Sequence, residues 1–259
     1  PMTSAATKAT ELLALHTGPK ILTLVNVWDV ASARAVAAVE GTRALATASH
    51  SIAAAYGYPD GEQIPLDLML TSIERIAAAV ELPVSADLEA GYGDPGATVR
   101  RAIAAGAVGG NLEDEMRPLG ESVAAVAAAV AAGEAEGVPF VLNARTDAFL
   151  RAGDRDPEHV LADAIERGRA FLAAGADCVF VPGRLDAATV MRLVEGIGDR
   201  KLSMIGVPGT LPQSELAAMG VARLSYGPWS QRIALTALAD TGAELLAGGA
   251  LPANVRVLT

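Results

Sequence analysis

The sequence predicts an α/β protein, a single (β/α)8 barrel that spans residues 1–259. Strand-like apolar runs alternate with amphipathic stretches that have apolar residues at i, i+3 and i+4, the spacing of a helix. The strand-like runs have no polar residue at alternate positions, which is typical of strands buried on both faces of a parallel sheet. A doubly wound open sheet remains the alternative, because periodicity does not show whether a sheet closes.

The order of the elements supports a barrel of eight strand-helix pairs. We expect strands at 21–28, 44–50, 83–89, 109–114, 140–146, 178–183, 202–207 and 222–227. Helices are expected between them, at 30–40, 66–80, 98–107, 158–176 and 188–198 among others. The stretches AAGAVGGNLED, AAGADCVFVPG and AAMGVARLSYG form a weak repeat, in which a helix ends at a glycine and a strand follows almost at once. No composition break marks a linker, so one barrel fits better than two domains.

Composition and charge narrow the possible partners to small molecules. A formal net charge of -10 argues against nucleic acid and anionic membranes, because both require a basic surface. No apolar run reaches the roughly 18 uncharged residues of a membrane span. The first residues, PMTSAATKATELL, lack the apolar core of a signal peptide. The single cysteine, Cys178, excludes an internal disulfide and agrees with a reducing compartment. We therefore expect a cytoplasmic protein.

Polar residues collect at the carboxyl ends of the predicted strands, where barrel enzymes place their chemistry. They are Asn26, Trp28, Asp29, Ser49, His50, Asp87, Glu89, Glu113, Asp114, Asn143, Arg145, Asp147, Ser225 and Tyr226. Capping of the next helix is the alternative role for any single carboxylate among them. Three carboxylates on one rim would repel one another, and a hard divalent cation removes that conflict. Only one of the three histidines is at a strand end, so Mg2+ or Mn2+ fits better than zinc.

Two other classes of barrel chemistry are not supported. A Schiff-base enzyme needs a lysine at the carboxyl ends of the strands, and Lys8, Lys20 and Lys201 all lie elsewhere. The glycines of GYGDPG, 91–96, do not have the spacing of a phosphate-binding loop and more simply allow a sharp turn. Arg145 is instead a natural clamp for a carboxylate ligand, with pairing to a neighbouring aspartate as the alternative.

Five segments resemble, in order and spacing, the isocitrate lyase/phosphoenolpyruvate mutase superfamily. They are NVWDVASA at 26–33, SHSIAAAYGYPDG at 49–61, SADLEAGYGD at 85–94, NLEDE at 111–115 and NARTDAF at 143–149. The resemblance extends from about Asn26 to Tyr226. It implies a (β/α)8 barrel, a Mg2+ or Mn2+ cofactor, and a small 2-oxo or 2-hydroxy carboxylate substrate. A carbon-carbon or carbon-phosphorus bond of that substrate would be cleaved or rearranged through an enolate.

The resemblance also implies roles for individual residues. Asp87 matches the principal metal ligand, and Glu89 and Glu113 match carboxylates that reach the ion directly or through water. Arg145, with Asn143 on the same strand, matches the position near the substrate carboxylate and the enolate oxygen.

Further matches concern the substrate and the proton. Ser49 and His50 match the segment whose backbone amides hold the substrate carboxylate, and Trp28 and Asp29 match residues stacked beneath the substrate. Asp60 matches a residue that gates the site. The proton donor could be water, His50 or Tyr92.

One departure from the superfamily affects the expected reaction. After L-E-D its lyases carry K-[KR]-C-G-H, whose cysteine protonates the departing enolate, whereas this chain has EMRPLGES at 115–122. We expect a Mg2+-dependent carbon-carbon lyase that works without this cysteine. A phosphoenolpyruvate mutase or phosphonopyruvate hydrolase, an oxaloacetate decarboxylase or hydrolase, and a barrel that only binds 2-oxo acids remain alternatives. The resemblance also implies a homo-oligomer, a dimer or tetramer, in which the last helix, 230–248, is exchanged between neighbouring barrels.

Overall fold

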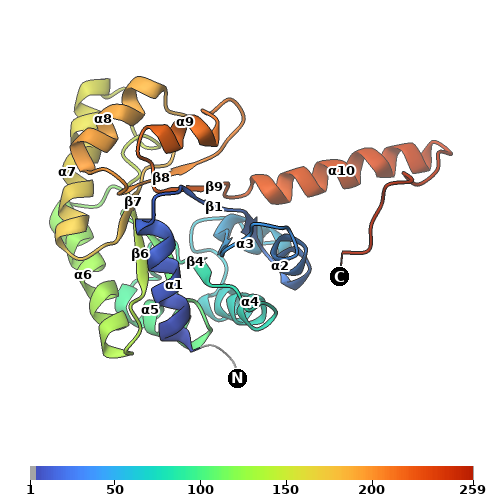
Figure 1. The fold of residues 1–259 in the computed structure, drawn as a ribbon, viewed down its shortest axis with the longest axis horizontal. Helices are drawn as coiled ribbons and strands as arrows, with labels where there is room; N and C mark the ends of the chain where they lie inside the picture. The colour runs from blue at the N-terminus through green and yellow to red at the C-terminus, as the bar shows by residue number, and fades with distance from the viewer. Residues whose placement is uncertain (1–3, 259) are drawn as a thin grey trace.

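The computed structural model describes residues 4–258 and confirms the (β/α)8 architecture (Figure 1). All strands are parallel and form one sheet in the order β1-β9-β8-β7-β6-β5-β4-β3-β2. They are β1 (Leu22–Leu24), β2 (Asn26–Val27), β3 (Leu45–Thr47), β4 (Val84–Asp87), β5 (Gly109–Glu113), β6 (Val141–Arg145), β7 (Cys178–Phe180), β8 (Leu202–Ile205) and β9 (Arg223–Ser225). Each predicted strand is therefore present, shortened at its ends.

The first strand closes the barrel because it pairs on both sides. β1 and β2 are one strand interrupted at Val25; β1 pairs with β9 and β2 pairs with β3. The amide side chain of Asn26 reinforces the junction. It donates to the carbonyl of Thr47 at 3.1 Å and accepts from the backbone N–H groups of Tyr226, at 2.7 Å, and Gly227, at 2.9 Å. The sheet is thus a closed barrel, and the doubly wound alternative is excluded.

Helices follow the strands and cover the outside of the sheet. They are α1 (Ala5–Thr17), α2 (Val30–Ala37), α3 (Ser49–Ala55), α4 (Leu66–Ala78), α5 (Pro95–Ala104), α6 (Leu119–Ala135), α7 (Pro157–Ala173), α8 (Ala187–Ile197), α9 (Gln213–Ala218) and α10 (Trp229–Leu246). Helices α2, α5, α7 and α8 each begin at an aspartate that accepts backbone N–H groups of the first turn. Gly106, Gly175 and Gly220 take the positive φ angles expected of glycines that end helices.

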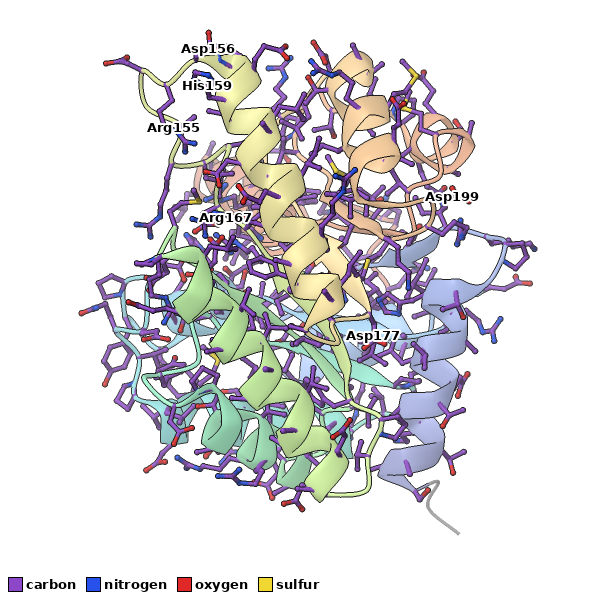
Figure 2. The ribbon with its side chains drawn as sticks, turned by 90° about the vertical axis from the view of Figure 1, so that its left-hand side faces the viewer. Arg155, Asp156, His159, Arg167, Asp177 and Asp199 are labelled. Carbon is purple, nitrogen blue, oxygen red and sulfur yellow. The ribbon has the colours of Figure 1, made fainter. Side chains whose placement is uncertain are left out.

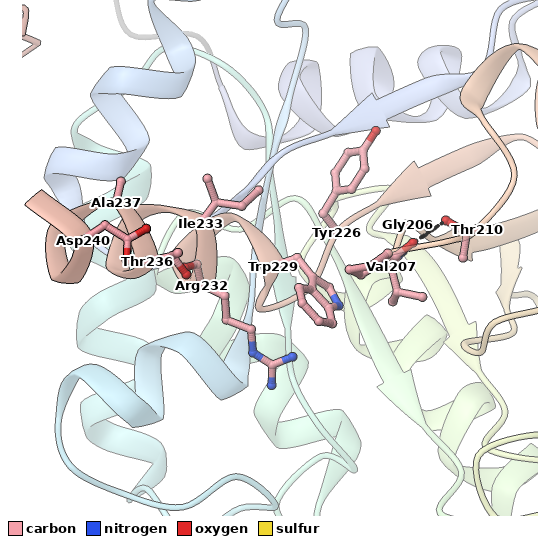
Figure 3. Close-up of a pocket in the computed structure, with 11 residues that line it drawn as sticks. Gly206, Val207, Thr210, Tyr226, Trp229, Arg232, Ile233, Thr236, Ala237 and Asp240 are labelled. Carbon is pink, nitrogen blue, oxygen red and sulfur yellow. Dashed lines mark hydrogen bonds between the residues drawn. The ribbon is translucent and has the colours of Figure 1, made fainter.

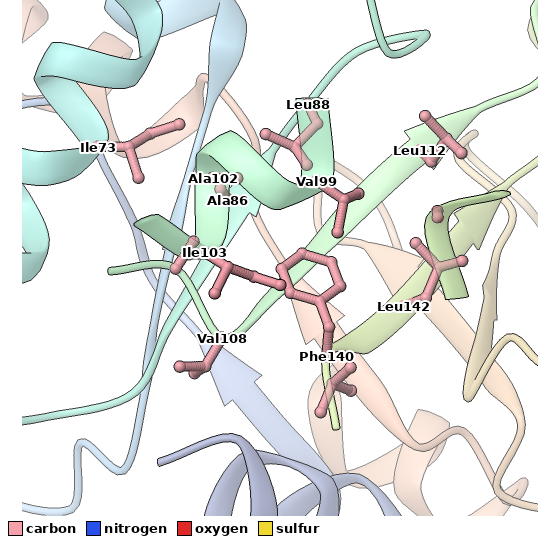
Figure 4. Close-up of a cluster of buried hydrophobic side chains, with 14 of the residues drawn as sticks. Ile73, Ala86, Leu88, Val99, Ala102, Ile103, Val108, Leu112, Phe140 and Leu142 are labelled. Carbon is pink, nitrogen blue, oxygen red and sulfur yellow. The ribbon is translucent and has the colours of Figure 1, made fainter. Parts of the chain in front are cut away.

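The hydrophobic core lies between the sheet and its helices. Near β4 and β5 it packs Phe140 with aliphatic side chains from the strands and from α4 and α5, among them Ile73, Leu88 and Val99 (Figure 4). Each fully buried side chain of this size stabilises the fold by about 1.5–3 kcal/mol. A Cβ atom at Gly110 would lie 2.7 Å from the carbonyl oxygen of Ala86, so the close approach of β4 and β5 requires glycine there.

Helix α10 leaves the barrel and extends away from it (Figure 1). Its first turn is attached to the barrel, because Ser230 donates to the carbonyl of Asn26 at 2.6 Å and Gln231 donates to that of Ser51 at 3.0 Å. Beyond that turn, apolar side chains are exposed, namely Ile233, Leu235, Leu238, Leu245 and Leu246. Within residues 4–258, no helix combines the length and the apolar character that crossing a membrane requires.

Candidate active site

A cavity of about 290 Å³ opens at the carboxyl ends of the strands. Its volume suits a small ligand. Ser49, His50, Asp60, Asp87 and Arg145, all predicted from the sequence, are among the residues that line it. The others are Asn26, Ala48, Asn111, Leu150, Phe180, Pro182, Gly183, Arg184, Ile205, Val207, Ser225, Gly227 and Pro228.

Asp87 is fixed by the start of α3. It is the last residue of β4, and its Oδ2 accepts hydrogen bonds from the Ser49 hydroxyl at 2.8 Å and the Ser49 backbone N–H at 3.1 Å. Ser49 and His50 were expected at the end of a strand, but β3 ends at Thr47 and both residues lie in the first turn of α3. This correction explains why a backbone N–H is available to Asp87, since the first N–H groups of a helix have no partner within it.

Glu89 anchors the neighbouring loop. It follows β4 with a positive φ of 52°, and its Oε1 accepts the backbone N–H groups of Gly61, at 3.0 Å, and Glu62, at 2.7 Å. Its Oε2 accepts the hydroxyl of Tyr92 at 2.6 Å. Burial raises the pKa of both Glu89 and Tyr92. Both residues therefore hold the loop that contains Asp60, and neither lines the cavity.

Arg145 is held between two carboxylates. Its Nη1 lies 2.8 Å from Oε2 of Glu113, and its Nε donates to Oδ1 of Asp147 at 2.7 Å. Burial raises the pKa of Glu113 to about 8, with Asp87 and Asp147 acting in the same direction, although Arg145 lowers it. The guanidinium group also lies 5.9 Å from the centre of the Phe180 ring. Pairing of Arg145 with neighbouring acids is thus present, and the guanidinium still lines the cavity.

The short segment after β5 is held in place by Arg167 of α7. Arg167, on α7 (Figure 2), donates to Oδ2 of Asp114 at 3.1 Å and to the carbonyl of Arg117 at 3.0 Å. Asp114 also accepts the backbone N–H groups of Met116, at 2.9 Å, and Asp147, at 3.0 Å. Only a turn separates β5 from α6, and Glu115 and Met116 have positive φ angles within it. This turn belongs to the segment at 115–122, EMRPLGES, which contains no cysteine.

Four other predicted site residues lie outside the cavity lining, and one of them is Glu113, which pairs with Arg145. Asn143 is fully buried inside the barrel and donates to Asn111 at 2.8 Å and to Ser203 at 3.2 Å. Trp28 is half-buried and packs against the core. Asp29 caps α2 by accepting the N–H of Ser32.

The carboxylates do not gather into a ready-made ligand set. Among the described residues, no group of three or more His, Cys, Asp or Glu side chains could hold a metal ion, so Asp87, Glu89 and Glu113 are not brought together in that way. Asp87 and Asp60 are the two carboxylates that line the cavity. Mg2+ usually keeps several waters and binds through one or two carboxylates. The negative charge of Asp87 and Asp60 also raises the pKa of Glu89, which shows the concentration of charge that a cation would relieve.

Sequence reasoning missed several of the larger side chains that line the cavity. They are Leu150, Phe180, Pro182, Arg184, Ile205 and Val207. The apolar ones resemble any other residue of a buried strand end, and no local pattern shows that Arg184 reaches the cavity from the loop before α8. Asn26 and Ser225 were recognised as polar strand-end residues, but no role was assigned to them.

Known proteins resemble this chain over most of its length. The model of the family described as phosphoenolpyruvate phosphomutase matches residues 12–246. The chain is 30% identical to the phosphoenolpyruvate phosphomutase of Streptomyces hygroscopicus, with 87% of this chain and 76% of the relative covered. It is 29% identical to the oxaloacetate decarboxylase of Paraburkholderia xenovorans (strain LB400), with 89% and 79% covered. A crystal structure described as a candidate phosphonomutase, from Burkholderia cenocepacia J2315, has a TM-score of 0.87 and 40% identity over 95% of this chain and 100% of that one.

Together, the closed barrel, the carboxylates at its mouth and these relatives define an enzyme of the lyase and mutase type. The chain belongs to the phosphoenolpyruvate phosphomutase family, within the isocitrate lyase/phosphoenolpyruvate mutase superfamily. The resemblance inferred from five short segments is therefore confirmed.

Proposed function

We propose that the protein is a divalent-metal-dependent lyase, with Mg2+ or Mn2+ as the cation, that cleaves a carbon-carbon bond of a small 2-oxo or 2-hydroxy acid. The observation that supports this best is the placement of Asp87 and Arg145 in one small cavity. The relatives include an oxaloacetate decarboxylase, an enzyme whose name describes carbon-carbon cleavage.

Asp87 would hold the cation, with Asp60 and Glu113 reaching it through water and Glu89 supporting the loop between them. When bound, the cation would supply positive charge next to the substrate 2-oxygen, which becomes negative in the enolate. The Ser49 hydroxyl and N–H fix the orientation of Asp87 through their hydrogen bonds.

Arg145 would bind the substrate carboxylate and the developing negative charge. Its Nη1 and Nε are used by Glu113 and Asp147, so Nη2 is the nitrogen left to donate to a ligand. The two acids fix the plane of the guanidinium before the substrate arrives, which removes a reorganisation cost at the moment of reaction. Asn143 would support this arrangement from inside the barrel. The backbone amide of His50 would contact the substrate carboxylate, whereas that of Ser49 is used by Asp87.

His50 or water is favoured as the proton donor over Tyr92. The Tyr92 hydroxyl already donates to Glu89, whereas His50 lines the cavity and its Nδ1 is buried without a hydrogen-bond partner among the described residues. Asp60, at the edge of the same cavity, would gate it. Trp28 and Asp29 would approach the substrate only if the segment after β2 shifts toward the cavity.

The second candidate is a mutase or hydrolase that acts on a phosphonate such as phosphonopyruvate. The 40% identity to a candidate phosphonomutase and the match to the phosphomutase family favour it. The two proposals differ in their products, because only the phosphonate reaction rearranges or breaks a carbon-phosphorus bond. A barrel that binds 2-oxo acids without turnover is the remaining alternative.

A panel experiment tests these proposals together. Purified protein with MgCl2 is incubated with 2-oxo and 2-hydroxy acids and with phosphonopyruvate, and release of pyruvate, glyoxylate or phosphate is measured. A lyase releases a 2-oxo acid from a carboxylic substrate, and Asp87→Ala abolishes this. The control is Asp154→Ala, at an exposed loop position. If the panel yields no product while oxalate raises the melting temperature only when metal is present, the binding-only alternative gains support; if metal changes neither readout, the metal proposal is wrong.

The exposed face of α10 supports a proposal that the protein is a homo-oligomer. A hollow of about 580 Å³ lies beside this helix (Figure 3). Trp229, Ile233 and Tyr226 are among its residues, and it contains none of the strand-end carboxylates. An exposed apolar helix face of this kind is typical of a surface that another subunit covers. Light scattering would give the mass in solution, and a monomer at all concentrations would contradict the proposal.

A further inference from the structure

We propose that Arg184 makes the enzyme selective for dicarboxylic acids, by binding a second carboxylate of the substrate that neither Arg145 nor the proposed cation holds. This inference rests on the proposed function and assigns the residue that would bind a second carboxylate. The charged side chains of the cavity, the contact of Arg184 with Gly209 and the apolar lining support it.

The charges of the cavity leave one guanidinium group without a partner. Two arginines line the cavity, and Arg145 is already held by Glu113 and Asp147. Within residues 4–258, Arg184 forms no hydrogen bond or ion pair. An anionic group that enters the cavity therefore finds in Arg184 a positive charge that no protein carboxylate neutralises, and arginine binds carboxylates in a bidentate geometry.

The guanidinium group of Arg184, an exposed residue, lies against Gly209. Arg184 lies in the loop between β7 and α8 and packs on Gly209, in the loop after β8. A Cβ atom at Gly209 would lie 2.5 Å from Nη2 and 2.8 Å from Cζ of Arg184. Any larger residue at position 209 would therefore displace the guanidinium.

Five other side chains that line the cavity are apolar, namely Leu150, Phe180, Pro182, Ile205 and Val207, and Phe180 lies beside Arg145. We refer to these five side chains as the apolar wall of the cavity. A polar ligand group placed against these side chains would lose its water without gaining a hydrogen bond, which is unfavourable. Methylene or methyl groups suit the apolar wall, and a terminal carboxylate suits Arg184. The wall thus fits a short dicarboxylic acid of about four or five carbons in a cavity of this size.

The inference is tested with two ligands that differ only at the far end. Malate and 2-hydroxybutyrate share the 2-hydroxy carboxylate and the chain length, but only malate has a terminal carboxylate. Calorimetric titration in MgCl2 is expected to show malate bound at least roughly tenfold more tightly by the wild type, the size expected of a charge-assisted hydrogen bond. Arg184→Gln should remove this preference by weakening malate binding about tenfold, while binding of 2-hydroxybutyrate and of oxalate stays unchanged.

Two further variants separate the guanidinium from general effects. Gly209→Ala keeps the arginine but displaces it, and the malate preference should fall in the same way. Arg100→Gln removes an exposed arginine on α5 that lies outside the cavity and should change nothing. If Arg184→Gln keeps the malate preference, or weakens all three ligands equally, the inference is wrong. If the wild type binds neither oxalate nor malate with metal present, the proposed function itself fails, and the inference with it.

Discussion

Buried arginines have different partners at the barrel mouth and in the barrel interior. At the mouth, Arg145 is one guanidinium group among several carboxylates, and burial raises the pKa of Glu113 and Glu89. In the interior, Arg223 is 1% exposed, and its nearest partners are neutral: Ser85 at 3.2 Å, Asn111 at 3.4 Å and His16 at 3.5 Å.

This difference separates charged groups that are placed to bind a ligand from charged groups that affect only the stability of the fold. Excess negative charge at the mouth destabilises the empty site and is relieved by a cation. The interior guanidinium has only neutral partners, its Nε has no hydrogen-bond partner among the described residues, and burial lowers its pKa to about 10. Of its partners, Asn111 lines the cavity. Changes at the mouth should therefore affect activity and spare stability, and changes in the interior should do the reverse.

The largest expected effect is the loss of activity in Asp87→Ala. Removing the residue proposed to hold the cation should lower kcat/KM by about 1,000-fold, equivalent to about 4 kcal/mol of transition-state stabilisation. The midpoint of urea unfolding should stay the same or rise slightly, because one of several mutually repelling carboxylates is gone. A lower urea midpoint together with full activity would contradict the comparison, because Asp87 would then stabilise the fold without being needed for activity.

Arg223→Ala should have its effect on stability. The large-to-small change leaves a cavity in the barrel interior, so the free energy of unfolding should fall by about 3 kcal/mol, measured by urea denaturation. The kcat of the folded protein should stay within about threefold of the wild type, since the side chain does not line the cavity. Arg100→Ala, on the surface of α5, is the matched control. A loss of activity without loss of stability would show that the interior charge acts on the site.

Arg145→Lys tests whether the barrel mouth needs the geometry of the guanidinium group in addition to its positive charge. Lysine keeps the charge but cannot hold Glu113 and Asp147 while presenting a further nitrogen to the ligand. We expect kcat/KM to fall about 100-fold, with the melting temperature nearly unchanged. Steady-state kinetics on the substrate found in the panel would measure this. Near wild-type kinetics would mean that charge alone, without the fork geometry, is enough.

The smallest effect concerns His16, which gives the interior a pH dependence of its own. Burial, aided by Arg223, lowers the pKa of His16 from 6.5 to about 3. Stability from its neutral form is therefore fully present above pH 6.5 and is lost as the pH falls toward 3. Between pH 6.5 and 5 the loss is about 2 kcal/mol, at about 1.4 kcal/mol per pH unit. His16→Gln should flatten this part of the profile of unfolding free energy; an unchanged slope would assign it to other groups.

The sequence predicted the fold well because its signals are local. Strands at 44–50 or 178–183 are visible as apolar runs, and Gly106 and Gly175 mark the ends of helices within a few residues. The closure of the barrel is different. It depends on pairing of β1 with β9, about 200 positions apart, and no short pattern encodes that.

The site was predictable only where a residue stands at the end of a strand. Asp87 and Arg145 end β4 and β6, so parallel strands bring them to one cavity. Glu89 lies beyond its strand in a left-handed turn that directs it to the loop at 61–62 instead. Asn143 lies two residues before the end of β6 and therefore points to the barrel interior, below the cavity. Arg184 belongs to a loop whose reach is set by packing on Gly209.

The hydrogen bonds of Asn26 that close the barrel also have a consequence for folding during synthesis. Its side chain joins β3 to the residues after β9, and Asn26 and its partner Gly227 both line the cavity. A ribosome releases Tyr226 two hundred residues after Asn26, so a growing chain can pack most of its helices before the mouth exists. The cavity residues that follow β9, such as Gly227, are therefore among the last of the site to be synthesised, and a chain stalled before β9 would carry the proposed metal ligands without them.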